Sequence, residues 1–427
     1  MASKNALNRS MNDDGLFWEA DNPETKFPGK VLFSGKHIHF TTSPVYASIA
    51  TEHLPELFGR IGQMSPLSAL PVLLGQLGGS PCTLIDLHPT NDGGFTDLSR
   101  MQSVSYKQYR VSLCVLGIHL AGPLEPSVNS ARFSYSALKH WQKALFDVAF
   151  DDESTTIKFN RNTPPFVEGT SIDKQFVFSF DIKPELQIIS GEIRTRNEAV
   201  FEIKPHLPKS LDWMLNIGYR IENFFCLVVG SSLRVQSIAL KIRTEIGWCR
   251  RQIHGTTAEV RHQVTIRLTS AQLAHSIALW LDLPEDFRPL EKLLYAIRNE
   301  KVSERTRFLT IANGLEGLHR LTNPDPKQEF TFSQRIHDLL SRLSPDFGAR
   351  LVGNLKQFVD NLATTRNNLT HPGIQIKPTV ITDDGDLFMF TQKCNALLRF
   401  LVLQHVGMEE SITAEPIYQQ SRTWTIL

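Results

Sequence analysis

The sequence lacks an excess of charge of either sign, so it has no obvious signature of a protein that binds nucleic acid over a broad surface. Across 427 residues, 45 Lys and Arg side chains are balanced by 44 Asp and Glu side chains, for a formal net charge of +1. Proteins that cover nucleic acid carry a clear basic excess. A basic site confined to a small area is still compatible with this balance, because a sum over the whole chain conceals local patches.

Cysteine is scarce and widely scattered. No two of the five cysteines lie within 20 residues of each other. No Cys-x-x-Cys pair is therefore present, which argues against zinc ribbons and thioredoxin-like redox sites. An odd number of scattered cysteines favours free thiols in a reducing compartment. The five are Cys82, Cys114, Cys226, Cys249 and Cys394.

Long hydrophobic runs are also missing. No stretch approaches the roughly 18 apolar residues of a transmembrane helix. The first 15 residues are polar and contain no apolar core of a secretory signal. We therefore predict a cytoplasmic protein that does not enter a membrane, with residues 1–15 as a flexible tail.

Motifs for cofactors and metals are absent as well. The glycine-rich residues 75–80 are not followed by Lys-Ser/Thr, so they predict a turn rather than a phosphate-binding loop. His37 and His39 alternate along one predicted strand, but no third ligand lies near them in sequence, which favours a strand surface over a metal site. The sequence contains neither a nucleophile elbow nor a His-Glu-x-x-His pair. We expect no cofactor and no metal.

The remaining composition is that of a globular protein, with 41% hydrophobic and 21% charged residues. At about 150 residues per domain, the length indicates two or three domains. Residues 16–285 are predicted to be rich in β-strands, with one internal helix near 211–229. The predicted strands cover residues 30–33, 37–40, 82–87, 109–116, 130–135, 176–180, 186–189, 237–242 and 264–268.

Residues 286–427 have a different pattern, in which apolar residues recur every three or four positions. Five such sets follow one another without a strand between them, which predicts a bundle of four or five helices. The predicted fold class is therefore α+β and multidomain, with a β-rich N-terminal region, a boundary near 285 and an all-α C-terminal bundle. The sets lie within residues 290–297, 308–318, 336–343, 351–362 and 388–402.

One of the predicted bundle helices ends with the sequence Arg-Asn-Asn-Leu-Thr-His-Pro-Gly. Pro372 disfavours the helical conformation for the residue before it, so the helix should end at or before Thr370. His371 then lies at the helix C-terminus, with Arg366 in the last turns. Five residues correspond to about 140° around a straight helix, so contact between these two side chains depends on the path of the helix end.

The two side chains suit the cleavage of RNA. A guanidinium binds phosphate oxygens in pairs and stays charged, whereas histidine exchanges a proton near neutral pH. Together they could activate a 2′-hydroxyl and stabilise the charge on a phosphate without a metal. Asn367 could orient either group. The alternative is an ordinary polar helix terminus, where Arg, Asn and His are common.

Arg366-Asn367, followed by His371 and Pro372, resembles the RNxxxH signature of HEPN domains (higher eukaryotes and prokaryotes nucleotide-binding). Residues 307–321 resemble an earlier helix of that bundle, with its Leu-Glu-x-Leu-His run, and the resemblance extends over about residues 288–407. Shorter matches at residues 15–19, 29–33 and 82–86 are similar to the N-terminal domain of ApeA-like bacterial anti-phage proteins.

This resemblance implies a metal-independent endoribonuclease that acts in abortive infection as a homodimer, with two motifs facing one cleft. It also implies products with a 2′,3′-cyclic phosphate and a 5′-hydroxyl, RNA as the substrate with transfer RNA as the expected class, and a phage-derived trigger. The catalytic residues would be Arg366, Asn367 and His371, with Glu316 as a candidate auxiliary residue. Residues 16–285 would then be the sensing or regulatory region and residues 286–427 the HEPN bundle.

Two other functions agree with the same residues. The bundle could be a non-catalytic module that binds RNA or a nucleotide, joined to a ligand-sensing N-terminal region. It could also be a scaffold or antitoxin-like partner, although a scaffold has no need of the complete Arg-Asn-His set. The basic residues 298–307 and the mixed basic and aromatic residues 248–254 could guide RNA, but solvated surfaces have the same composition.

Overall fold

The structure is a computed structural model that describes most of the chain. The described residues are 12–34, 37–42, 45–48, 70–97, 102–120, 122, 124–125, 127–135, 138, 146–150, 155–159, 167–189, 192–230, 233, 235–251, 266–299, 302–323, 325, 328–371 and 377–423.

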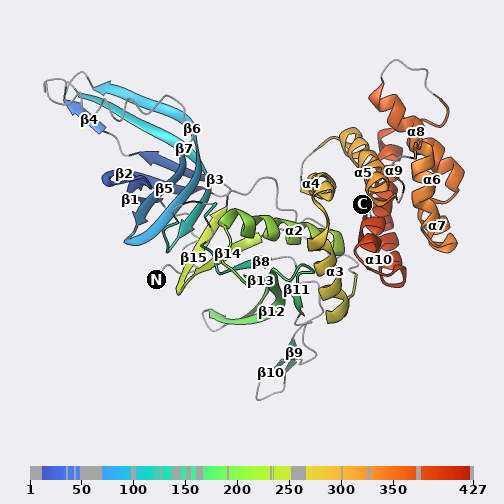
Figure 1. The fold of residues 1–427 in the computed structure, drawn as a ribbon, viewed down its shortest axis with the longest axis horizontal. Coiled ribbons are helices and arrows are strands. Elements are labelled where there is room, and N and C mark those ends of the chain that lie inside the picture. The colour runs from blue at the N-terminus through green and yellow to red at the C-terminus, as the bar shows by residue number, and fades with distance from the viewer. Residues whose placement is uncertain are drawn as a thin grey trace. The chain divides into compact units, whose positions relative to one another are not determined.

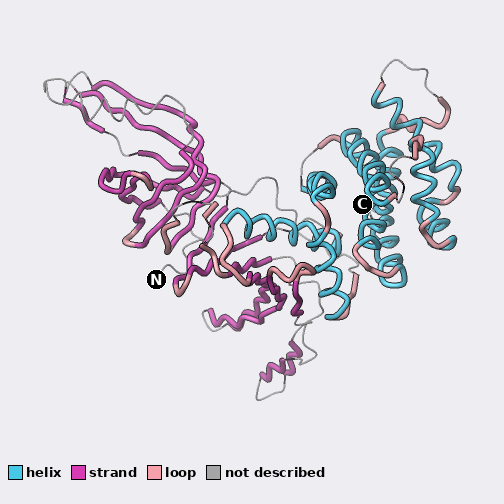
Figure 2. Tube along the Cα trace, viewed as in Figure 1, coloured by secondary structure: helices cyan, strands magenta, loops and turns pink. Residues whose placement is uncertain are grey.

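Strands dominate the first half of the described chain and helices dominate the rest (Figures 1 and 2), which confirms the predicted α+β fold class. The strands are β1 (Asn12–Glu19), β2 (Asn22–Ser34), β3 (His37–Thr42), β4 (Val45–Ser48), β5 (Leu70–Leu77), β6 (Ser80–Asp97), β7 (Gln102–Leu116), β8 (Ser130–Tyr135), β9 (Phe146–Phe150), β10 (Thr155–Phe159), β11 (Val167–Thr170), β12 (Phe176–Ile189), β13 (Glu192–Pro205), β14 (Val235–Ile242) and β15 (Glu245–Arg251). The helices are α2 (Leu211–Val229), α3 (Ser270–Asp282), the 3-10 helix η3 (Glu285–Phe287), α4 (Arg288–Asn299), α5 (Glu304–Thr322), α6 (Phe332–Ser341), α7 (Pro345–Val352), α8 (Leu355–Thr370), α9 (Asp384–His405) and α10 (Glu410–Thr423).

The chain divides into two compact units, and neither is continuous in sequence. The first unit contains residues Met1–Ser134, Phe201–Asn216 and Val235–His254. The second contains Tyr135–Val200, Ile217–Arg234 and Gly255–Leu427. The predicted boundary near 285 is therefore not the division between the two units.

The strands of the first unit are antiparallel and close on themselves. The order is β7-β3-β2-β1-β5-β6, and β6 pairs with β7 again. The predicted hairpin of residues 30–33 and 37–40 is confirmed, because β2 and β3 pair with Ser34 opposite His37. Alternate side chains of these strands point inward, as the twofold period of a strand requires. They form a buried cluster that includes Phe17, Val31 and Phe40.

Two predicted features of the first unit have clear outcomes. The turn within residues 75–80 is confirmed, since Gly78 and Gly79 join β5 to β6 with φ of +54° and +79°, values that favour glycine. The predicted 15-residue tail is too long, because Asn12 begins β1 and pairs with Leu32 of β2. Polar side chains there do not prevent strand pairing, since backbone groups make the ladder.

In the second unit, the latter part of α2 packs among helices. The predicted helix at 211–229 is confirmed to the residue by α2. Its Arg220 is 2% exposed and donates from Nη2 to Oε1 of Glu291 in α4 at 2.9 Å, and to the Trp280 carbonyl of α3 at 2.6 Å. These contacts explain why α3 and α4 share a compact unit with the end of α2.

The C-terminal end of α2 is held by α9 and α10. Arg399 of α9, 4% exposed, donates to the carbonyls of Leu227 and Val228, with the second contact at 2.9 Å. Arg399 also contacts the Gln420 side chain of α10. The last carbonyls of a helix have no partner inside the helix, so these donors satisfy groups that would otherwise be buried without hydrogen bonds.

The C-terminal helices are more numerous than predicted. After residue 286, the described residues contain seven helices, α4 to α10, rather than four or five. The predicted helix within 351–362 is in fact two. Gly353 adopts φ of +76° and ends α7, and the Asn354 side chain caps α8 by accepting from the Gln357 N–H at 3.0 Å.

Another predicted strand has no strand conformation in its described part. Residues 264–265 of the predicted strand 264–268 lie outside the described residues, and Ile266–Leu268 is irregular. This segment leads directly into the N-cap of α3, where Thr269 and Gln272 form a capping box. The helix start therefore sets the local conformation.

Three further findings concern the described residues alone. All five cysteines are free and buried. No described helix combines the length and the apolar character needed to cross a membrane. No three His, Cys, Asp or Glu side chains in the described segments gather in a way that could hold a metal ion.

Candidate active site at the end of α8

The predicted helix end is confirmed. α8 ends at Thr370, and His371 is its C-cap residue, with φ of −128° and ψ of 76°. The His371 N–H donates to the Asn367 carbonyl at 3.0 Å, so the backbone still follows the last turn. Asn367 and His371 are both exposed, as a reactive group must be if it is to reach a polymer substrate.

Arg366 lies on the same last turns but is held on another side. Its Nη2 donates to Oε2 of Glu316 in α5 at 3.3 Å, and the two side chains are 26% and 18% exposed. Its Nη1 donates to the side-chain oxygen of the neighbouring Asn367 at 3.4 Å. The structure therefore brings together three of the predicted site residues.

Glu316 is shared between two arginines. Its Oε1 accepts a hydrogen bond from Nη2 of Arg320, one helical turn further along α5, at 2.6 Å. One carboxylate facing two guanidiniums leaves a local charge of about +1, counted from the groups themselves. This small area is thus basic although the whole chain is nearly neutral.

An aromatic ring completes the surroundings of Arg366. The guanidinium carbon lies over the ring of Phe332, the first residue of α6, at 5.1 Å from the ring centre. Arg366 Nε is buried and has no hydrogen-bond partner among the described residues. The guanidinium is thus bounded by α5, α6 and its own helix.

The His371 imidazole is not hydrogen-bonded to this group in the described part of the chain. Among the described residues, no hydrogen bond or ion pair joins the His371 side chain to Arg366 or to Glu316. The single chain therefore positions the guanidinium and exposes the imidazole without joining them.

The segment that follows His371 returns to α8. Residues 372–376 lie outside the described residues, but the Ile381 N–H donates to Oγ1 of buried Thr365 at 3.0 Å. The chain is thus anchored again beside the helix turn that carries Arg366. Both ends of the segment that contains Pro372 are fixed on α8.

A second polar cluster lies next to the site, between α5 and α6. His319 is fully buried, with Arg335 Nη1 at 3.1 Å from its Nδ1 and Asp338 Oδ2 at 3.3 Å from its Nε2. Burial lowers the pKa of His319, and Asp338 acts in the opposite direction. Phe330 packs edge-on against this ring at 4.9 Å.

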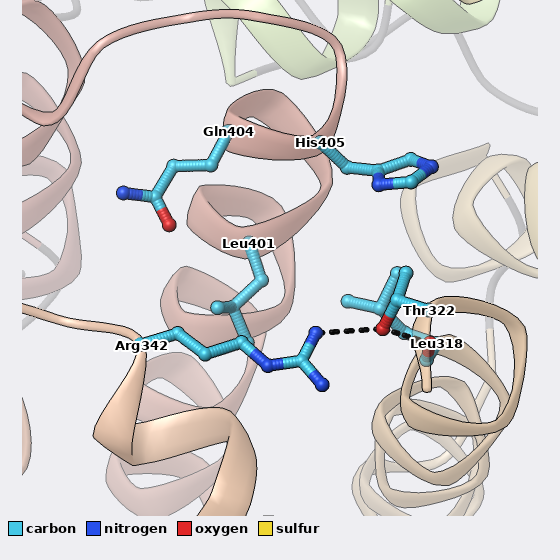
Figure 3. A pocket seen from close by; sticks show the side chains of 6 residues that line it. All are labelled: Leu318, Thr322, Arg342, Leu401, Gln404 and His405. Carbon is cyan, nitrogen blue, oxygen red and sulfur yellow. Dashed lines mark hydrogen bonds between the residues drawn. The ribbon is translucent and has the colours of Figure 1, made fainter. Parts of the chain in front are cut away.

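A cavity of about 200 Å³ is found near the last turns of α5, α6 and α9 (Figure 3). Its Arg342 guanidinium is already engaged, since Nη1 donates to Thr322 at 2.7 Å and Nη2 donates to Asp338 at 2.7 Å. The predicted site residues do not line it. The lining residues are Leu318, Thr322, Arg342, Leu401, Gln404 and His405.

The remaining candidate residues from the sequence lie apart from this site, and their contacts are with other protein side chains. Nη2 of Arg110 lies 3.1 Å from Nδ1 of His37, which places a cation beside the pair formed by His37 and His39. Trp248 is half-buried against the strand cluster of the first unit, and residues 252–254 lie outside the described residues. Arg305, from the basic stretch 298–307, forms an exposed ion pair with Asp384 at 3.6 Å.

Two residues of this site were missed in the sequence. Arg320 stands four residues after Glu316, and that spacing on a helix predicts contact between the two side chains. Phe332 gave no signal, because it lies 34 positions before Arg366 and on a different helix. Only the packing of α6 against α8 brings them together.

Comparison with known proteins finds two family models that match consecutive parts of the chain. The family model described as ApeA N-terminal domain 1 matches residues 14–282, and the model described as Apea-like HEPN matches residues 309–412. No curated protein and no solved structure matches the chain significantly. HEPN domains are generally ribonucleases that bind RNA and dimerise, and the ApeA-like HEPN match supports an anti-phage effector. Because the first match alone covers more than half of the chain, the protein belongs to the ApeA family, with an ApeA N-terminal domain followed by an ApeA-like HEPN domain.

Proposed function

We propose that the protein is a metal-independent endoribonuclease that acts in abortive infection. The observation that carries this proposal is the end of α8, where Arg366, Asn367 and His371 share two helical turns. Glu316 and Phe332 hold the guanidinium from two other helices. An exposed imidazole at the end of the helix that carries a fixed guanidinium supplies the two kinds of group that phosphodiester cleavage uses.

The proposed reaction is an intramolecular transfer at phosphorus. His371 accepts the proton of a ribose 2′-hydroxyl, and the 2′-oxygen forms a bond to the adjacent phosphorus. The bond from phosphorus to the 5′-oxygen breaks, and that oxygen leaves with a proton from a general acid. The products carry a 2′,3′-cyclic phosphate and a 5′-hydroxyl. Arg366 stabilises the charge on the phosphate oxygens, and Asn367 orients the guanidinium through its side-chain oxygen.

Two copies of the chain would complete the site. Within one chain, the Arg366 guanidinium faces Glu316 while the His371 imidazole is exposed and separate. If two α8 ends face each other in a homodimer, one imidazole can act as base and the other as acid on the same phosphate. We therefore propose a dimeric cleft as the cleavage site, with RNA recognition confined to its vicinity.

The biological role follows from the family. An ApeA N-terminal domain joined to a HEPN domain supports a division in which the N-terminal region responds to a phage-derived trigger and the bundle cuts RNA. Cleavage of transfer RNA in the cytoplasm would stop translation and thereby stop the phage. We propose transfer RNA as the first substrate to test.

A second candidate function is RNA binding without cleavage. It is favoured by one observation, that Glu316 already occupies part of the Arg366 guanidinium. A motif in this state could hold a phosphate weakly without reacting. Purified protein that shifts RNA in a gel but leaves it intact would support this alternative.

The test uses the full-length protein and bulk bacterial transfer RNA. Arg366→Ala and His371→Ala should each abolish cleavage, because each removes one of the two groups that the reaction needs. EDTA should leave wild-type cleavage unchanged, and the products should show 2′,3′-cyclic phosphate ends.

Matched controls are available on the same bundle. Arg305→Ala removes an exposed arginine of α5, and His337→Ala removes an exposed histidine of α6. Both should cleave like the wild type, and all variants should keep the wild-type melting temperature. Normal cleavage by both Arg366→Ala and His371→Ala would refute the proposal.

A further inference from the structure

The guanidinium carbon of Arg366 lies over the aromatic ring of Phe332. We propose that Phe332 is a positioning residue for Arg366, which holds the plane of the guanidinium so that its free donors face the phosphate. This inference rests on the proposed ribonuclease function and adds a residue from another helix to it. The contact is the one at 5.1 Å between the guanidinium carbon and the ring centre.

The face of a guanidinium is the place where support leaves its donors available. All five N–H groups of arginine lie in the plane of the guanidinium, so a ring stacked on the face blocks none of them. Glu316 and Asn367 each use an edge, through Nη2 and Nη1. Each terminal nitrogen still keeps one N–H, which a phosphate oxygen could accept.

A carboxylate alone cannot provide this orientation. Glu316 is divided between Arg366 at 3.3 Å and Arg320 at 2.6 Å, so its stronger contact is with the other arginine. A carboxylate also neutralises the charge that should act on phosphate. The ring of Phe332 attracts the cation through its quadrupole and leaves the positive charge in place.

The ring itself is held by the start of α6. Phe332 is the first residue after the N-cap Thr331, and Thr331 forms a capping box with Gln334. The Thr331 N–H donates to the Gln334 side chain at 2.8 Å, and the Gln334 N–H donates to the Thr331 hydroxyl at 3.3 Å. A reciprocal cap of this kind fixes the backbone from which Phe332 extends.

Phe330 offers a matched control. It stands two residues earlier, and its ring contacts His319 and Arg335, with Arg335 at 5.8 Å, instead of Arg366. Replacement of either phenylalanine by leucine removes one ring from the same few residues of chain. A general loosening of the start of α6 would affect both variants alike, whereas loss of the Arg366 support affects only one.

The experiment compares Phe332→Leu, Phe332→Trp and Phe330→Leu in the full-length protein, with bulk bacterial transfer RNA as the probe. Phe332→Leu should lower the single-turnover cleavage rate about tenfold, the change expected for the loss of one cation–π contact. Phe332→Trp should keep most of the rate, because indole binds a cation at least as well. Phe330→Leu should stay within about twofold of the wild type.

A second measurement does not depend on cleavage. In protein labelled with ¹⁵N-arginine, the Nε resonance of Arg366, assigned by its loss in Arg366→Lys, should become more mobile in Phe332→Leu but not in Phe332→Trp or Phe330→Leu. An unchanged Arg366 resonance in Phe332→Leu would overturn the inference. So would equal cleavage rates for Phe332→Leu and the wild type. If the wild type does not cut RNA at all, the ribonuclease proposal fails, and the Arg366 mobility still decides whether Phe332 positions this arginine.

Discussion

Arg399 provides the strongest test of how the end of α2 is held in the bundle. We predict that Arg399→Met destabilises the protein far more than the removal of an exposed arginine. The methionine keeps most of the aliphatic stem and thus the packing around it. It removes the donors to the carbonyls of Leu227 and Val228 and to the side chain of Gln420, all of which are buried.

The expected magnitude follows from these lost partners. A buried acceptor left without a donor costs about 1–3 kcal/mol. Arg399→Met leaves three neutral acceptors without a donor and no unpaired charge, so this figure applies to each, and the three costs add only in part because the acceptors share one guanidinium. A loss of about 4 kcal/mol is a large fraction of the roughly 5–15 kcal/mol that stabilises a typical protein.

The assay is urea unfolding of the full-length protein, followed by the helical circular dichroism signal. The matched control is Arg305→Met on α5, whose exposed pair with Asp384 should contribute little. Arg399→Met should shift the midpoint to lower urea by about 1–2 M, and Arg305→Met should leave it nearly unchanged. Equal midpoints for the two variants would refute the argument that Arg399 satisfies the end of α2.

Two further predictions concern α5. Gly317→Ala should raise the free energy of unfolding by up to about 1 kcal/mol, because a Cβ there meets nothing within 4 Å and alanine favours helix. Gly314→Ala should give a smaller gain, since its Cβ would lie 2.8 Å from Leu398. Urea unfolding measures both, and an equal gain at the two sites would contradict the packing. Burial lowers the pKa of His319 in the folded protein, so the unfolded chain binds a proton more readily than the folded one. The contribution of His319 to the free energy of unfolding should therefore be full above the ordinary pKa of about 6.5 and should decrease as the pH falls below it. Melting temperatures between about pH 5 and pH 7.5 should therefore fall less on acidification in His319→Gln than in the wild type, and equal slopes would contradict this assignment.

The sequence predicted the elements with strong local signals. The limits of α2, the end of α8 before His371 and the turn between β5 and β6 follow from apolar periodicity, proline and glycine, respectively. A prediction failed where a cap decided the outcome, because Asn354 divides a continuous apolar pattern into two helices. Tertiary contacts were also beyond the reach of the sequence, as in the buried contact between Arg220 of α2 and Glu291 of α4.

The candidate site could also be predicted only in part. The sequence shows the spacing of Arg366 and His371 along one helix, but the side chains that contact the guanidinium of Arg366 come from α5 and α6. A periodic pattern indicates which face of a helix is buried, but it does not indicate which side chain of another helix contacts that face. Glu316 became a candidate through family resemblance, and Phe332 had neither resemblance nor spacing to reveal it.

The whole chain is nearly neutral, but the group formed by Glu316, Arg320 and Arg366 has a net positive charge. If Glu316 had a single arginine partner, the pair would be neutral and would attract phosphate weakly. Because Arg320 and Arg366 share one carboxylate, the group retains a positive charge without an unpaired buried cation. A phosphate that approaches Arg366 would therefore be attracted over a short range only, since exposed charges are screened within about 8 Å in physiological salt. This range agrees with the dimeric cleft proposed above, in which a nearly neutral chain would act on a polyanion only at close approach.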